Sequence, residues 1–478
     1  MLVAHHGSIW LRRFCAKHGE TESLYEESAE LWRARAGWNT PTLAITPDRV
    51  DNYRAAPGSY ADGLPASHGQ HTCILLLNIT DRCNYGCTTC YASAKTPGTP
   101  VSPLERPTRE DILFTVQTVL TRENGKLGVL MLSGGEPTVR DDLPEIIAEL
   151  VELNITRVVI NTNGRRIARD DRFVEFLRGH RSRIEVYLQF DGVQANTSRL
   201  LRNEDVVAEK LEALRRLDAA GIYTTLVATV QRGVNEEEIG DLVRIGLDTP
   251  HCAGLALQPV FGSGRTVSID PRNRTTPTGL LARMKERTGG IIEGSDFIPL
   301  PCSHRDCCDI GYLIRTADGQ WKPLLKLLGA DELKKWIHLV SNTISFDGVS
   351  QDVAAMLKSG ALQRIFSEQL PIGMPALAKD IGWMCDCIPG LPELLSGIGA
   401  RIGRKENMLE LAAQRTFRIT IKMFMDAHTF HAARLRQCCV HTGTFETDPR
   451  RYSFCWRWLF ADALDFPEPG FIPMRTLK

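Results

Sequence analysis

The sequence predicts an α/β protein whose strands pair in parallel through helical crossovers. Six short apolar segments, rich in Val, Ile, Leu and Tyr, alternate with helical periods between about residues 73 and 262. Because parallel strands need a crossover connection, this alternation favours an open doubly wound sheet or a partial barrel. In either fold a ligand binds at the carboxyl ends of the strands. The predicted strands are residues 73–79, 128–132, 157–161, 184–190, 223–230 and 254–260.

Apolar stripes predict helices between these strands. Thr108 stands three residues before Asp111, which is typical of a helix N-terminus with an acid in its first turn. The three stripes consist of Leu143, Ile146, Ile147, Leu150 and Val151; of Val207, Leu211, Leu214 and Leu217; and of Ile239, Leu242 and Val243.

Length and composition are those of a globular protein of several domains. The chain has 478 residues, 43% of them hydrophobic and 24% charged, which argues against disorder. Its 57 basic and 57 acidic residues balance, so the charge gives no indication of a nucleic-acid partner. The predicted divisions are an N-terminal extension (1–69), a core (70–267) and a cysteine-rich C-terminal region (268–478) that opens on a polar linker at 268–279.

Neither a membrane span nor a secretory signal is visible. No apolar run approaches the ~20 residues that cross a bilayer, and the first twenty residues lack an apolar signal segment. We therefore expect a cytoplasmic protein. The amphipathic segment 456–466 could make a peripheral membrane contact, although a helix that covers the core is the simpler interpretation.

Fourteen cysteines favour metal or redox chemistry over a disulfide framework. Cys83, Cys87 and Cys90 lie on one short loop after the first predicted strand. Three thiolates at these spacings can hold three irons of a [4Fe–4S] cluster and leave the fourth iron open. A zinc knuckle would need a fourth ligand. Burial as small apolar side chains is the other alternative, and we expect it for Cys73 and Cys252.

This CxxxCxxC loop resembles that of the radical S-adenosylmethionine (radical SAM) superfamily. SGGEP at 133–137 follows the second strand and resembles the family's GGE motif. The third and fourth strands end in NTNG at 161–164 and QFDG at 189–192, where family members contact the ribose or the substrate. Thr89 departs from the pattern, because many members have an aromatic residue just before the third cysteine, whereas here Tyr91 follows it.

The resemblance implies a partial (β/α)6 TIM-type barrel over about residues 73–265. It implies a [4Fe–4S] cluster on the three loop cysteines, with S-adenosylmethionine on the open iron. An external one-electron donor of the flavodoxin or ferredoxin type would drive cleavage to a 5′-deoxyadenosyl radical, which abstracts hydrogen from an unactivated carbon. The cofactor-binding residues that it implies are Gly134, Gly135, Glu136 (to the methionine ammonium), Asn161, Asn163, Gln189, Asp191 and Tyr91 (near adenine).

Longer strings resemble one subgroup of that family, which contains archaeal tetraether lipid synthases, related bacterial enzymes proposed to join fatty acyl chains, and dihydropterin dimethyltransferases. The strings are FCAKHGE (14–20), DFIPLPCSHRDCC (296–308), FMDAHTF (424–430), CCVH (438–441) and SFC (453–455). Subgroup members often begin with a rubredoxin-like iron site. Only half of it is visible here, as Cys15 and His18, so we expect an unligated Cys15 in a partial remnant.

Such proteins carry extra metal centres, and the C-terminal cysteines could supply one. Cys302, Cys307, Cys439 and Cys455 form the predicted ligand set of an auxiliary [4Fe–4S] cluster. Neighbouring side chains point apart in extended backbone, so both members of an adjacent pair cannot easily serve one cluster. The cysteines left for a second site or for the core are Cys308, Cys438, Cys385 and Cys387.

The main functional hypothesis is carbon–carbon bond formation between lipid chains, which predicts a long apolar channel. Radical methylation of a pterin or another small molecule is the first alternative and predicts a compact polar pocket. Peptide maturation is the second, although the usual spacing of its C-terminal cysteines is not evident. An iron–sulfur electron carrier or zinc-stabilised scaffold without catalysis is the third, but a carrier does not need the GGEP motif.

Overall fold

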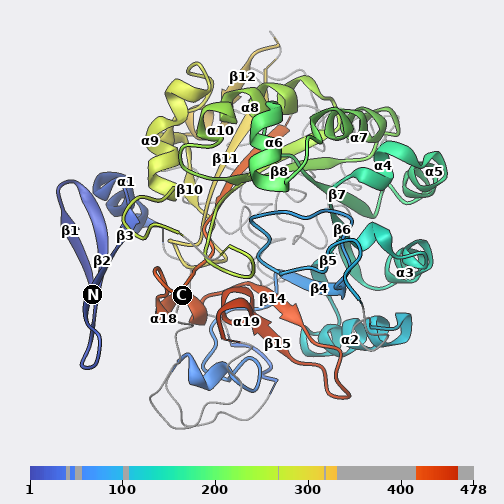
Figure 1. Ribbon diagram of the computed structural model, residues 1–478, viewed down its shortest axis with the longest axis horizontal. Helices are drawn as coiled ribbons and strands as arrows, with labels where there is room; N and C mark the ends of the chain where they lie inside the picture. The colour runs from blue at the N-terminus through green and yellow to red at the C-terminus, as the bar shows by residue number, and fades with distance from the viewer. Residues whose placement is uncertain are drawn as a thin grey trace, which may run out of the picture.

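The computed structural model describes residues 1–38, 44–48, 56–100, 107–266, 269–316, 319–330 and 416–460. One curved, mostly parallel sheet forms its centre, and helices cover the outer side of that sheet (Figure 1). This arrangement confirms the predicted α/β class and is consistent with a partial barrel. Cys385, Cys387 and the end of the segment 456–466 lie outside the described residues.

All six predicted strands are present, with small changes at their ends. They pair in parallel and in chain order, so each crossover leads to the neighbouring strand. The strands are β4 (Ile74–Thr80), β5 (Leu127–Gly134), β6 (Ile155–Thr162), β7 (Ile184–Gln189), β8 (Thr224–Val230) and β9 (Cys252–Pro259).

The predicted helices are also present, and Thr108 caps the first crossover helix in a reciprocal box with Asp111. One stripe was assigned wrongly: Leu211 is 43% exposed, whereas Lys210 is buried in its place. The helices are α2 (Arg109–Arg122), α3 (Leu143–Leu150), α4 (Arg165–Arg169), α5 (Asp171–Gly179), α6 (Ala195–Arg202), α7 (Val207–Ala219), α8 (Ile239–Asp248) and α9 (Pro277–Arg287). α9 begins inside the stretch that we expected to be a linker.

Strands from the C-terminal region extend the sheet at both ends, which the sequence pattern did not indicate. β13 (Thr416–Lys422) pairs in parallel with β9, and β14 (Val440–Gly443) pairs in parallel with β4. The remaining elements are β10 (Ile298–Pro299), β11 (Cys308–Arg315), β12 (Trp321–Pro323), α10 (Leu324–Leu328), α18 (Ala432–Arg436), β15 (Arg451–Ser453) and α19 (Phe454–Phe460).

Alternate residues of each strand face two separate cores. One core fills the space between the sheet and its helices, and includes Leu75, Leu130 and Ile160. The other lies on the inner face and includes Leu76, Met131, Val159, Tyr187 and Val227. The inner core also contains Trp456 and Phe460 of α19, which supports the interpretation of this helix as a cover for the core. No helix among the described residues is both long and apolar enough to cross a membrane.

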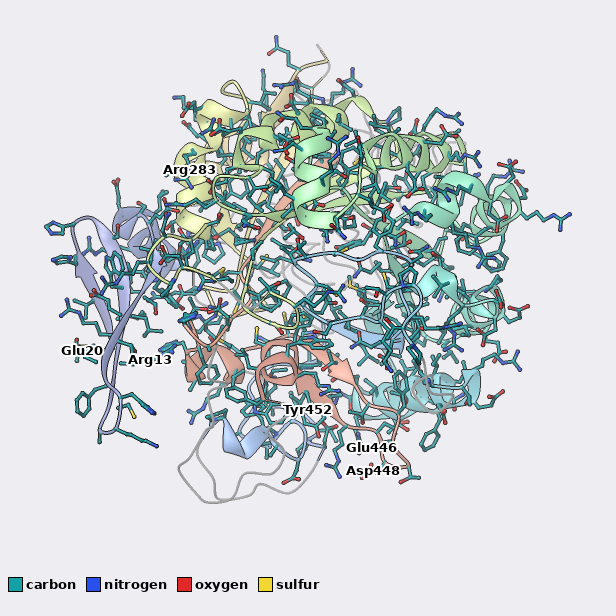
Figure 2. All side chains as sticks on the ribbon, viewed as in Figure 1. Arg13, Glu20, Arg283, Glu446, Asp448 and Tyr452 are labelled. Atoms are coloured by element: carbon teal, nitrogen blue, oxygen red, sulfur yellow. The ribbon has the colours of Figure 1, made fainter. Side chains whose placement is uncertain are left out.

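The N-terminal residues form a separate three-stranded sheet of β1 (Leu2–His5), β2 (Ser8–Cys15) and β3 (Gly19–Glu26), followed by α1 (Ala29–Ala34). Arg13 and Glu20 mark the projecting β2–β3 hairpin in Figure 2. Cys15 is exposed at its tip, with its Sγ 3.4 Å from His18 Nδ1.

Candidate active site

The loop after β4 carries Cys83, Cys87 and Cys90, and all three are partly buried. Burial raises the pKa of Cys83 to about 12, and the charges of Glu136 and the other two cysteines act in the same direction. The three thiols therefore lie close enough to interact electrostatically. Without a cation the Cys83 thiol stays protonated, whereas a metal cluster would stabilise the thiolate form. The donor set thus fits a three-cysteine iron–sulfur site.

Arg265, on the segment after β9, holds this loop in place. Its Nε donates to the Cys87 carbonyl oxygen (2.9 Å), its Nη1 to the Ala94 carbonyl oxygen (2.5 Å) and its backbone N–H to the Cys90 carbonyl oxygen (2.9 Å). Backbone N–H groups also reach two sulfurs: Tyr85 N lies 3.4 Å from Cys83 Sγ, and Ala94 N lies 3.4 Å from Cys90 Sγ. The cysteine loop is thus held in place by hydrogen bonds from Arg265 and from its own backbone N–H groups.

Gly134 and Gly135 bring the end of β5 against this loop. Gly134 has φ +124°, and a Cβ there would lie 2.3 Å from the Thr80 carbonyl oxygen. A Cβ on Gly135 would lie 2.1 Å from the Arg82 carbonyl oxygen. The two glycines therefore permit close contact with the backbone that leads into Cys83. Their predicted contact with S-adenosylmethionine stays a prediction.

Glu136 is 1% exposed and connects the ends of β5 and β6. Its Oε1 accepts from Thr138 N (3.0 Å), Thr138 Oγ1 (2.6 Å) and Thr162 Oγ1 (2.6 Å). Its Oε2 accepts only from Asn163 N (2.6 Å) among the described groups. A carboxylate oxygen has two lone pairs, so Oε2 can accept one further donor. A methionine ammonium would have to approach at that oxygen.

Two asparagines at the end of β6 connect this strand to its neighbours. Asn161 Nδ2 donates to Ser133 Oγ (3.1 Å), and that hydroxyl lies 3.4 Å from the Tyr91 hydroxyl. Asn163 Nδ2 donates to Asn84 Oδ1 (2.6 Å) on the cysteine loop. Tyr91 also packs among aromatic rings, including Phe261, Phe454 and Trp458.

At the end of β7, Gln189 and Asp191 contact two basic residues that we did not predict. Arg202 donates to both Asp191 carboxylate oxygens, at 2.6 and 2.7 Å. Lys210 donates to Gln189 Oε1 (2.9 Å) and to the Asn163 carbonyl oxygen. Burial, followed by the charge of Arg202, lowers the pKa of Lys210 to about 8. A signal for Lys210 does exist, since it takes an apolar-stripe position three residues after Val207.

A cavity of about 150 Å³ lies on the inner face of the sheet, among Val159, Tyr187 and other apolar side chains. Val159 and Tyr187 precede Asn161 and Gln189 by two residues, so the cavity lies roughly 7 Å below the polar strand ends. Glu185, Arg418 and Lys422 supply its charged groups. It is therefore a compact pocket with an apolar wall and a few polar groups, an arrangement suited to a small ligand.

The same cavity is lined by seven cysteines, which include all four predicted auxiliary ligands. Their binding of one cluster stays a prediction. Cys302 and Cys439 lie together, 3.9 Å apart at sulfur, whereas Cys307 accepts from Arg434 Nε (3.3 Å) and Cys455 accepts from Met425 N (3.3 Å). The seven cysteines are Cys73, Cys302, Cys307, Cys308, Cys438, Cys439 and Cys455.

Comparison with known proteins shows which proteins this chain resembles. Residues 77–245 match the model of the radical SAM superfamily. The 7,8-dihydro-6-hydroxymethylpterin dimethyltransferase of Methanocaldococcus jannaschii is 26% identical over 483 residues, covering 95% of this chain and 89% of its own. The GTP 3′,8-cyclase of Geobacter sulfurreducens is 26% identical over 189 residues, covering 38% and 54%. The crystal structure of Streptococcus suis SuiB bound to precursor peptide SuiA has a TM-score of 0.38 at 16% identity and covers 46% of each chain, too distant a likeness to support an argument.

Proposed function

We propose that this chain, which belongs to the radical SAM superfamily, is an enzyme that methylates a carbon atom of a pterin or a similarly compact heterocycle. The observation that carries the proposal is the similarity to a dihydropterin dimethyltransferase along almost the whole of both chains. The similarity therefore extends beyond the superfamily core at 77–245 into the cysteine-rich region.

The cavity supports a small substrate over a lipid. A cavity of about 150 Å³ is the size that accepts benzene, so it has room for one ring of a bicyclic heterocycle but not for the whole molecule. Two long acyl chains need a much larger channel. Neither the relatives nor this cavity gives support to the lipid hypothesis, and the pterin alternative takes its place.

The cofactors of this enzyme are a [4Fe–4S] cluster and S-adenosylmethionine, and an external reductant supplies the electron. We propose Cys83, Cys87 and Cys90 as the cluster ligands. When bound, the cluster supplies reductive cleavage of S-adenosylmethionine and thereby hydrogen abstraction. The chain's own residues position that cofactor: Arg265 holds the cysteine loop, and Glu136 offers Oε2 to the methionine ammonium.

A charged substrate edge would meet Glu185, Arg418 and Lys422. Glu185 is 5% exposed and accepts from Thr225 Oγ1 (2.5 Å), with Arg418 Nη2 3.5 Å away. A heterocycle with both donors and acceptors on its rim can add hydrogen bonds to such groups, whereas a hydrocarbon chain offers them none. We therefore place the substrate ring against the inner face of β6, β7 and β13, below the strand ends.

The experiment is an anaerobic assay of the reconstituted protein with dithionite, S-adenosylmethionine and 7,8-dihydro-6-hydroxymethylpterin. We expect 5′-deoxyadenosine together with a methylated pterin. Cys87→Ala should abolish both products, and Cys252→Ala, at a buried cysteine outside the cavity lining, should preserve them. 5′-Deoxyadenosine formed with an acyl lipid or a peptide, and not with the pterin, would contradict the proposed substrate. No cofactor cleavage with any substrate would favour the electron-carrier alternative.

A further inference from the structure

Three cysteines from distant parts of the chain meet at one point beside the cavity. The sulfurs of Cys73, Cys302 and Cys439 all lie within 4.8 Å of one another, and each residue is 2–3% exposed. Cys73 precedes β4, Cys439 precedes β14, and Cys302 follows β10. Backbone bonds join two of them, since the N–H of Cys73 donates to the Cys439 carbonyl oxygen at 2.9 Å.

The sulfur spacing is that of ligands on a single ion. Zn–S bonds of about 2.3 Å in a tetrahedron place two ligand sulfurs about 3.8 Å apart. The Cys302 and Cys439 sulfurs lie 3.9 Å apart. In a [4Fe–4S] cluster each thiolate binds a different iron at a separate corner, so its sulfurs lie much farther apart. The geometry therefore favours a mononuclear centre at this point.

A possible fourth donor lies next to one of the three thiols, that of Cys73. His71 Nε2 lies 3.4 Å from Cys73 Sγ, close to the about 3.6 Å between a sulfur and a nitrogen that share one zinc ion. His71 Nδ1 lies 3.0 Å from Gln70 Oε1, an acceptor. That bond places the proton on Nδ1 and leaves the Nε2 lone pair directed at the thiols, which is how a metal-binding histidine is usually oriented. His71 is not within 4.8 Å of all three sulfurs, so its ring must turn toward Cys302 and Cys439 for Nε2 to bind an ion held there.

We propose that Cys73, Cys302, Cys439 and His71 bind one Zn²⁺ ion. Three thiolates and one imidazole are a recognised closed set for structural zinc. This set replaces Cys307 and Cys455 of the predicted auxiliary cluster by Cys73 and His71. Because all four positions are filled by protein, the ion has no open site for substrate and its role is structural.

The ion connects the two ends of the sheet. Cys73 and Cys439 belong to the β4–β14 end, whereas Cys302 lies on the loop between β10 and β11, at the opposite end of the strand order. The surroundings of the thiols are apolar, with Ile74, Leu300 and Val440 packed against them. Zinc binding would thus hold the wall of the substrate cavity together, and the inference stands whether or not the substrate is a pterin.

The test is metal analysis with X-ray absorption at the zinc edge on the full-length protein, purified anaerobically from zinc-containing medium. Zinc absorption is separate from that of the iron cluster. We expect about one zinc per chain, with three sulfur neighbours near 2.3 Å and one nitrogen near 2.0 Å. The absence of zinc, or a shell without three sulfurs, would overturn the proposal.

Variants identify the ligands. Cys302→Ser should reduce zinc at least tenfold and leave the iron content unchanged, while Cys252→Ser should retain both metals. His71→Ala should exchange the nitrogen neighbour for a water oxygen. Retention of zinc in Cys302→Ser, or a loss of about four irons in place of zinc, would refute the site and favour a cluster. If Cys302→Ser fails to fold, the zinc-edge spectrum of the unaltered protein decides alone.

Discussion

Substitution of Gly135 by alanine should prevent cluster assembly without touching any metal ligand. The new Cβ would lie 2.1 Å from the carbonyl oxygen of Arg82, the residue directly before Cys83, and 2.6 Å from its carbonyl carbon. Both are backbone atoms, so no side chain can rotate away. The same carbonyl oxygen accepts from Glu136 N at 2.9 Å. Relief of the clash therefore moves the cysteine loop and Glu136 apart.

The size of the effect follows from these contacts. A Cβ tolerates a carbonyl oxygen at no less than about 3 Å, so the loop must retreat by about 1 Å. Overpacking of this kind costs about 1–3 kcal/mol, and the loss of the Glu136–Arg82 hydrogen bond adds about 1 kcal/mol. A total near 3 kcal/mol corresponds to about a hundredfold weaker hold on the cluster, if the strain falls on the cysteine loop.

The assay is the iron and sulfide content after anaerobic reconstitution, with Gly86→Ala as the matched control. Gly86 lies between Cys83 and Cys87, yet the nearest atom to a Cβ there is 3.8 Å away, at Asn203 Nδ2. We expect Gly86→Ala to bind iron like the unaltered protein and Gly135→Ala to lose most of it. Equal iron contents in the two variants would show that close packing of β5 on the loop is not needed for cluster binding.

Three further predictions concern the same site and the N-terminal hairpin. Glu136→Gln keeps an acceptor for Thr138 and Thr162 but removes the charge at Oε2. The affinity for S-adenosylmethionine, measured by anaerobic calorimetry, should therefore fall about 10- to 100-fold while the iron content stays unchanged. An unchanged affinity would show that Glu136 does not bind the cofactor. Since the pKa of Lys210 is lowered to about 8 from its usual 10.5, the unfolded chain binds more protons between these values and stability should rise with pH across that window, by up to about 3 kcal/mol. The free energy of unfolding, measured in urea at pH 8 and pH 10, should show this increase in the unaltered protein and not in Lys210→Met. The same pH dependence in the two proteins would contradict a Lys210 pKa lowered by burial. Cys15→Ser should leave iron content and turnover unchanged because Cys15 is exposed, with His18 beside it, whereas the loss of one iron would indicate a rubredoxin-like centre.

Local signals explain why the core strands could be predicted. Each strand of the parallel sheet is a short run of apolar residues bounded by turn residues, and Thr108 marks a helix start by its own side chain. The cysteine loop was equally visible, because its three cysteines lie close together in sequence, at 83, 87 and 90. The end strand β14 could not be found in this way. It has four residues, only one of them apolar, and it is defined by pairing with β4, more than 350 residues away.

Cys73 shows that the local sequence also fails to reveal a site whose residues are far apart in the chain. In the sequence it is one apolar-segment cysteine with no cysteine neighbour, for which burial is the ordinary expectation. The fold brings it within 4.8 Å of two thiols that are 229 and 366 positions away. Of the adjacent pair, Cys439 lies beside Cys73, while the Cys438 thiol donates to the Val440 carbonyl oxygen at 3.1 Å. The pairing of β14 with β4 determines that Cys439, and not Cys438, lies beside Cys73. This pairing is a property of the fold that the local sequence does not show.

The position of the thiols bears on how the substrate cavity is closed. β4 and β9 are the first and last strands of the parallel core, and a partial barrel leaves a gap between them. Here β13 and β14 continue the sheet from both sides, and the thiols of Cys73, Cys302 and Cys439 meet where these additions face one another. An ion at that point would fix the cavity wall beside Tyr187 and Lys422 without occupying the strand ends at which we propose that the cofactor binds. The cysteine-rich region would then determine the size of the cavity, and the core would supply the radical chemistry.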